Sequence, residues 1–163
     1  MHENRILIHK LKNFENINSN FLIITLMLFG SILLAISAKV QVPFWPVPMT
    51  MQTFVIFLIG MTYSVRLSFA TVAFYLFQGA IGLPVFAAGG GVAYLVGPTA
   101  GYLYGMLFAS IVISYLANLG FSKTYFKATV SLLIGSAIIF TFGIIYLGYI
   151  IGFEKAVAAG LLP

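Results

Sequence analysis

Residues 82–102 read GLPVFAAGGGVAYLVGPTAGY, a glycine-rich run that also contains two prolines. The run lies within residues 67–122, a stretch with no Lys, Arg, Asp or Glu. It therefore interrupts helical structure at or in a membrane. In lipid every unpaired backbone N–H or C=O is costly, so irregular backbone at this depth must be buried in protein or line a wet cavity. We expect the run to contribute to a ligand site.

The composition is that of an integral membrane protein. Of the 163 residues, 61% are hydrophobic and 7% are charged, against about 25% charged residues in soluble domains. The charges separate apolar blocks that compare with the roughly 20 residues needed to cross a bilayer. The blocks are residues 21–38, 49–65, 67–81, 102–119 and 128–152, and a sixth begins near residue 156. We predict an all-α, polytopic transmembrane helical bundle with five full spans, a truncated sixth and an irregular outer loop between helices 3 and 4.

The residue types of the chain argue against a catalytic site and against a metal site. The chain has no cysteine, which excludes disulfides and thiolate metal sites. His2 and His9 both lie in the polar N-terminal arm, where we interpret them as solvated residues. No carboxylate lies between Glu15 and Glu154, so paired-carboxylate catalysis is excluded from the apolar interior. We predict neither an enzyme nor a metal or cofactor site.

The distribution of charge predicts the topology. The net charge is +5, and a cytoplasmic N-terminus leaves only Lys39 and Lys155 outside, which satisfies the positive-inside rule. The basic residues placed inside are Arg5, Lys10, Lys12, Arg66, Lys123 and Lys127. Topology alone explains the basic excess, so no nucleic-acid partner is expected. We treat residues 1–163 as a single membrane domain, with residues 1–18 as a cytoplasmic N-terminal arm.

The predicted outer side carries the more informative residues. Residues 41–48, QVPFWPVP, contain three prolines, which predict an extended segment. Its Phe44 and Trp45 suit the membrane interface and ligand stacking equally well. Gln52 and Gln78 should face the bundle interior or a cavity, and hydrogen bonding between helices is as good an explanation for each as ligand contact.

Small residues recur four apart within the predicted helices. Such spacing allows close approach of helix backbones, and we favour packing inside the bundle over contact with a partner protein. The residues are Ser31 and Ala35, then Gly97, Gly101 and Gly105, then Gly148 and Gly152. Three further glycines, at residues 89–91, fit a loop that folds back into the bundle better than a flexible turn. No GK[ST] follows them, so a phosphate-binding loop is not supported.

Three stretches together resemble the biotin transporter S-component family, BioY, of energy-coupling-factor transporters. They are QVPFWPVPMTMQTF at residues 41–54, FQGAIGLPVFAAGGG at 77–91 and GPTAGYLYG at 97–105. The resemblance covers roughly residues 31–108. It implies a six-helix subunit of the bacterial inner membrane that captures biotin from outside. It also implies an energy-coupling transmembrane subunit and ATP-binding subunits as partners, with Ser31 and Ala35 corresponding approximately to a small-residue pattern that contacts the coupling subunit.

The resemblance, with the residue types, gives a candidate set of ligand-binding residues. The set is Gln52, Leu83, Phe86, Gly89, Gly90, Gly91, Tyr94 and Tyr102. Two departures from the family pattern affect it. Gly90 stands where members can carry a ligand-binding asparagine, and the chain ends at Pro163, where a pattern with an Asp and a Lys would begin. We therefore expect a truncated chain or, alternatively, a degenerate member. Lys39 and Lys155 are the only cations expected on the outer side. Either could reach the mouth of a pocket, but we favour side chains that extend to the membrane interface for both.

Two other functions remain open on this evidence. The same scaffold could take up another vitamin or small solute, because Gly90 departs from the family. Alternatively, the chain could be a structural or assembly subunit that associates with other helices, or with itself, and holds no ligand. Membrane lipid surrounds the chain in every case.

The topology is testable with reporter fusions. A reporter that is active only in the cytoplasm should be active when fused at the N-terminus and within the loop at residues 123–127. An external N-terminus would contradict the placement of residues 82–102 on the outer side.

Overall fold

Seven α-helices, one 3-10 helix and one short hairpin make up residues 19–160, which are the residues described by the structure, a computed structural model. Side chains are described for residues 20–158. The predictions for the arm at residues 1–18, with His2 and His9, lie outside the described residues, as do residues 161–163.

The predicted apolar blocks correspond to five of these helices. They are α2 (Ser19–Lys39), α3 (Gln52–Thr62), α4 (Val65–Ala80), α6 (Ala100–Asn118) and α7 (Tyr125–Ile151). Within residues 19–160, α2, α6 and α7 are long and apolar enough to cross a membrane. The helices α3 and α4 have 11 and 16 residues, so at 1.5 Å per residue α3 is much shorter than a hydrocarbon core of about 30 Å.

The helix α3 is shorter than predicted for reasons visible at both ends. Its predicted first residues instead form β2 (Met49–Thr50), which pairs antiparallel with β1 (Gln41–Val42). At the other end Tyr63 is extended, with φ −95° and ψ 154°. The extended conformation predicted for residues 41–48 is confirmed at β1, while the pairing of the two strands was not foreseen.

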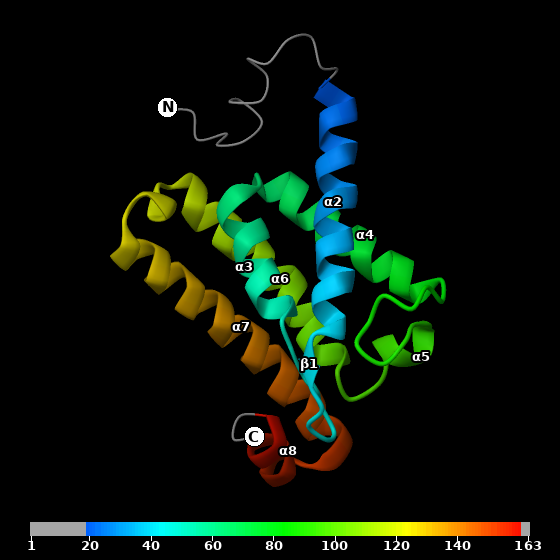
Figure 1. Ribbon diagram of the computed structural model, residues 1–163. Helices are drawn as coiled ribbons and strands as arrows, with labels where there is room; N and C mark the ends of the chain where they lie inside the picture. The colour runs from blue at the N-terminus through cyan, green and yellow to red at the C-terminus, as the bar shows by residue number, and fades with distance from the viewer. Residues whose placement is uncertain (1–18, 161–163) are drawn as a thin grey trace.

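The helix α6 is central to the packing of the bundle. It contacts α3, α4 and α7, while α2 packs against α3 and α4 (Figure 1). After Gly152, which has φ +89°, the chain turns back and α8 (Phe153–Gly160) packs against α7.

Between α4 and α6 the irregular segment contains only the short helix α5 (Val92–Leu95). Between α6 and α7 the 3-10 helix η1 (Phe121–Lys123) makes the connection. Of the predicted irregular residues 82–102, the structure has α5 at residues 92–95 and the beginning of α6 from residue 100, and the others lie outside α-helices.

Glycines set the close approach of α6 to α7. A Cβ atom on Gly105 would lie 2.9 Å from the Cα of Ile139, and one on Gly101 would lie 2.6 Å from the carbonyl oxygen of Phe142. Both distances are shorter than side-chain contacts allow, so a larger residue would force the helices apart. Of the two explanations for this spacing, packing inside the bundle is therefore the one found at Gly101 and Gly105.

The substitution Gly105→Leu should destabilise the bundle. The added side chain meets the α7 backbone, which has no flexible end to move, and overpacking of this kind costs about 1–3 kcal/mol or more. Thermal unfolding in detergent should show a lower melting temperature than for Thr141→Leu, a change at an exposed α7 position. Equal melting temperatures for the two variants would contradict the assignment of Gly105 to the α6–α7 contact.

Candidate ligand-binding site

A cavity of about 360 Å³ opens between the hairpin and helices α3, α6 and α7. Its volume lies within the roughly 300–1,000 Å³ typical of small-molecule sites. The lining residues come from the hairpin, the irregular segment and these three helices. They are Phe44, Val47, Pro48, Met49, Thr50, Gln52, Thr53, Ala87, Tyr94, Thr99, Tyr102, Leu103, Met106, Ile139 and Phe140.

The chemistry of this lining is aromatic and aliphatic, with a few uncharged polar groups. The rings of Tyr102 and Phe140 meet edge to face, with their centroids 6.3 Å apart. Threonine hydroxyls and the Gln52 amide supply hydrogen-bonding groups. Among the described residues that line the cavity, none is charged. Such a site suits a small ligand with a largely apolar body and a localised polar edge.

The polar side of the cavity is organised around Gln52. This residue is the first of α3, and its side chain is 4% exposed. Its Oε1 accepts a hydrogen bond from Thr50 Oγ1 at 3.0 Å, and its Nε2 donates to the Tyr75 hydroxyl at 2.7 Å. The Tyr75 hydroxyl in turn donates to the carbonyl oxygen of Val85 at 2.9 Å. A continuous set of hydrogen bonds thus joins β2, α3, α4 and the irregular segment.

The predicted binding residues divide into two groups. Gln52, Tyr94 and Tyr102 line the cavity, whereas Leu83, Phe86 and the three glycines at residues 89–91 are not among its lining residues. Phe86 is fully buried in the hydrophobic core. Its ring stacks on that of Tyr94, with centroids 4.9 Å apart, so Phe86 supports a residue of the cavity wall from behind.

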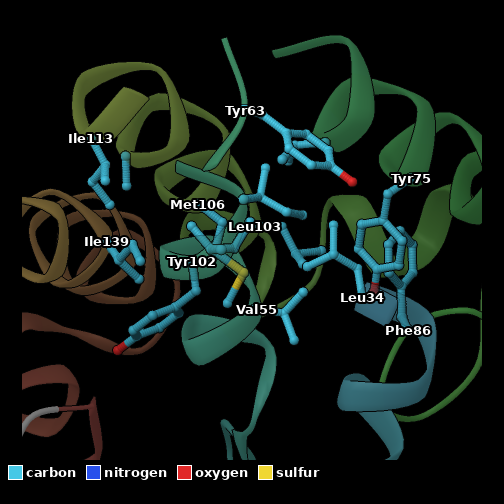
Figure 2. Packing of buried hydrophobic residues seen from close by; sticks show 14 of the residues in the cluster. Leu34, Val55, Tyr63, Tyr75, Phe86, Tyr102, Leu103, Met106, Ile113 and Ile139 are labelled. Atoms are coloured by element: carbon cyan, nitrogen blue, oxygen red, sulfur yellow. The ribbon is translucent and has the colours of Figure 1, made fainter. Parts of the chain in front are cut away.

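The Phe86 ring packs against α4 at Gly79, where the helix has no side chain. Its ring meets Tyr75 edge to face, with centroids 5.5 Å apart, and Figure 2 shows these two side chains next to each other. A Cβ atom on Gly79 would collide with the Phe86 ring. Gly79 in α4 is therefore required for the irregular segment to anchor itself in the core.

The three glycines shape the backbone of the irregular segment. Gly89 and Gly91 have φ of +137° and +102°, which side-chain-bearing residues rarely adopt. The N–H of Gly91 donates to the carbonyl of Gly79 at 2.7 Å. A Cβ atom on Gly90 would collide with the carbonyl oxygen of Leu83. The Gly91–Gly79 hydrogen bond connects this part of the segment to α4.

The two cations predicted on the outer side are placed differently. Lys39, at the end of α2, donates from Nζ to the carbonyl oxygen of Phe86 at 2.6 Å. Lys155 is exposed on α8. Neither is among the residues that line the cavity. The hydrogen bond from Lys39 thus connects the irregular segment to α2.

Ser31 and Ala35, the predicted partner contacts, face the interior. Ser31 is 1% exposed and its hydroxyl donates to Oε1 of Gln78 in α4. Ala35 packs against the hydrophobic core. Gln78 therefore forms a hydrogen bond between helices, which is one of the two roles predicted for it; the other is ligand contact. The exposed side of α2 carries larger apolar residues, namely Ile24, Leu28, Ile32 and Ile36.

Most of the remaining lining residues carried no signal in the sequence. Leu103, Met106, Ile139 and Phe140 resemble any other apolar residue of a membrane helix. Thr50 and Thr53 lie close to Gln52 in the sequence. Their hydroxyl groups are a polar feature that could have indicated these two lining residues. Of the two aromatic residues of the hairpin that suited either role, Phe44 lines the cavity, whereas Trp45 is 89% exposed.

Comparison with known proteins gives a consistent match. The model of the BioY family matches residues 10–163. A probable biotin transporter BioY from Rickettsia prowazekii is 35% identical over 89% of this chain and 75% of its own length. The biotin transporter BioY of Thermotoga maritima is 38% identical over 80% of this chain and 78% of its own. A crystal structure of the S-component for biotin from an ECF-type ABC transporter superposes with a TM-score of 0.78, covering 90% of this chain and 83% of that one. At 24% identity that likeness shows a shared fold.

The role of Gly90 in the loop backbone is open to a direct test. The substitution Gly90→Ala should displace the Leu83 carbonyl and loosen residues 82–99, because the added methyl group meets backbone rather than a movable side chain. Hydrogen exchange of the loop amides should speed up in Gly90→Ala and stay unchanged in Ala88→Ser, a change at an exposed neighbour. Unchanged exchange in both variants would contradict the close contact of Gly90 with Leu83.

Proposed function

The chain belongs to the BioY family, and from this premise we propose that it is the substrate-binding membrane subunit of a biotin uptake transporter. Its relatives are named as biotin transporters, and membership of a transporter family makes it a binding subunit rather than an enzyme. The observation that carries the proposal is the cavity bounded by the hairpin and helices α3, α6 and α7, with Gln52 on its polar side.

Biotin matches the chemistry of this cavity in its ring system. Aromatic and aliphatic side chains would cover the bicyclic head, and the Gln52 amide would meet the urea edge, which needs both donors and acceptors. Burying an unpaired carboxylate is costly, and the described lining residues are uncharged. The carboxylate therefore lies toward the opening, where it keeps its hydration. Leu83, Phe86 and the glycines at residues 89–91 serve the site by holding its wall.

In the membrane, helices α2, α3, α4, α6 and α7 form the five spans of a single domain. The hairpin precedes the short α3 and extends the chain beyond the first residue of this helix, and its two strands are largely exposed. Their backbone groups pair with each other across the hairpin. The N-terminus faces the cytoplasm, and the hairpin and irregular segment face outward. The chain resides in the inner membrane of a bacterium.

An energy-coupling transmembrane subunit and ATP-binding subunits are the proposed partners, with self-association as the alternative. Contact through α2 would use its exposed side, including Ile32 and Ile36, because Ser31 is buried against α4. Ala35 packs against the core. Its small side chain would allow α2 to pack closely against the bundle, on the side opposite the partner.

Filling the cavity tests the proposal directly. Thr53 lines the cavity, whereas its neighbour Phe54 is 55% exposed. In a biotin titration of purified protein, Thr53→Trp should weaken binding by about tenfold or more, the factor that roughly 1.4 kcal/mol of steric cost represents. Phe54→Trp should bind biotin as the unmodified protein does.

Two outcomes would overturn the proposal. If the unmodified protein shows no saturable binding of biotin, the substrate assignment fails. If biotin binds but Thr53→Trp and Phe54→Trp bind it equally well, the ligand does not occupy this cavity.

A further inference from the structure

We propose that Tyr75 is a positioning residue that locks the orientation of the Gln52 amide and thereby sets which ligand edge the cavity accepts. The inference rests on the proposed function, because it concerns recognition of the ligand in the same cavity. Tyr75 is not a lining residue. It is 1% exposed, and its hydroxyl bonds directly to one lining residue, Gln52.

The direction of each hydrogen bond in this set is forced by one acceptor. The carbonyl oxygen of Val85 has no proton to give, so the Tyr75 hydroxyl must donate to it. The same hydroxyl can then only accept from Gln52, which requires the amide nitrogen to face Tyr75. Reversing the amide would leave either Val85 or Gln52 with an unpaired buried group, which is costly.

Thr50 does not contribute to this choice. Its hydroxyl can donate to an amide oxygen or accept from an amide nitrogen, so it would pair with Gln52 in either orientation. Tyr75 is therefore the residue that distinguishes the two orientations. Without its hydroxyl, the amide could turn over and still bond to Thr50.

The locked amide keeps one hydrogen-bonding group of each kind for a ligand. A primary amide has two N–H donors and two acceptor positions on its oxygen. Within residues 19–160, Gln52 uses one donor on Tyr75 and one acceptor position on Thr50. One N–H and one lone pair therefore remain, and they are fixed together with the amide. They suit a ligand edge that offers both a C=O and an N–H, as in a cyclic urea or lactam.

A pair of ligands that differ in this edge can test the lock. Biotin has a urea carbonyl where 2-iminobiotin has a nitrogen that carries hydrogen, so the fixed Gln52 donor should favour biotin. At neutral pH 2-iminobiotin also carries a guanidinium charge, and burying that charge in an uncharged cavity disfavours it in every variant. We expect the unmodified protein to prefer biotin by more than tenfold, of which a factor of about ten comes from the unpaired donor. In Tyr75→Phe the amide is free to adapt, so the preference should fall by about tenfold while the part due to the charge stays.

Tyr63→Phe is the matched control. Tyr63 is also a buried tyrosine whose hydroxyl donates to a backbone carbonyl, that of Leu26 at 2.9 Å, and it is not among the residues that line the cavity. This variant should keep the full preference for biotin. Gln52→Met, which removes the amide outright, should lower the preference by the same factor as Tyr75→Phe does.

The outcomes separate this inference from the proposed function. Absence of biotin binding in the unmodified protein removes the proposed function itself. If biotin binds, an unchanged affinity ratio in Tyr75→Phe overturns the positioning role, as does loss of both ligands in equal measure. Retention of the full preference by Gln52→Met overturns it independently, without relying on the folding of Tyr75→Phe.

Discussion

The carbonyl groups of the irregular segment between α4 and α6 need hydrogen-bond donors, because lipid supplies none. Four side chains, one from each of α2, α4, α6 and α7, meet this need. The pairs are Lys39 with Phe86, Tyr75 with Val85, Tyr104 with Leu95 and Tyr146 with Val96. The helices surrounding the segment thus hold its backbone in place, and the cavity wall depends on these bonds, since the same segment supplies Ala87 and Tyr94 to the lining.

This constraint also explains which parts of the fold could be predicted from the sequence. The apolar blocks between charges predicted where helices lie, because a backbone in lipid has few other ways to pair its own groups. They did not predict where α3 begins, because Met49 pairs with Val42 instead of continuing the helix. Nor did they predict the donors of the irregular segment. Lys39 lies 47 residues from Phe86 in the chain, and a tyrosine in an apolar helix carries no mark of its partner.

The candidate site was predictable where a polar or aromatic residue stood in an unusual place. Gln52 is an amide in an apolar block, and it lines the cavity together with Tyr94 and Tyr102. Met106 and Ile139 line the same cavity, but membrane helices are apolar on all sides, so the sequence does not distinguish a cavity-facing residue from a lipid-facing one. Phe86 is a different case. It stays a predicted ligand contact, and the structure places its ring in the core against Gly79, which the sequence did not indicate.

Two hydrogen-bonded side chains connect the hairpin to the irregular segment, and this arrangement gives the site its polar character. Thr50 belongs to the hairpin and Val85 to the segment after α4, and Gln52 with Tyr75 connects them. Each of these bonds contributes a net stabilisation of only about 0.5–1.5 kcal/mol, whereas an unpaired buried member costs about 1–3 kcal/mol. The set is therefore favoured as a whole, and it connects the hairpin to the irregular segment through Gln52 and Tyr75. Because the Gln52 amide belongs to this set, a change of its hydrogen bonding would affect the hairpin and the glycine-rich segment together.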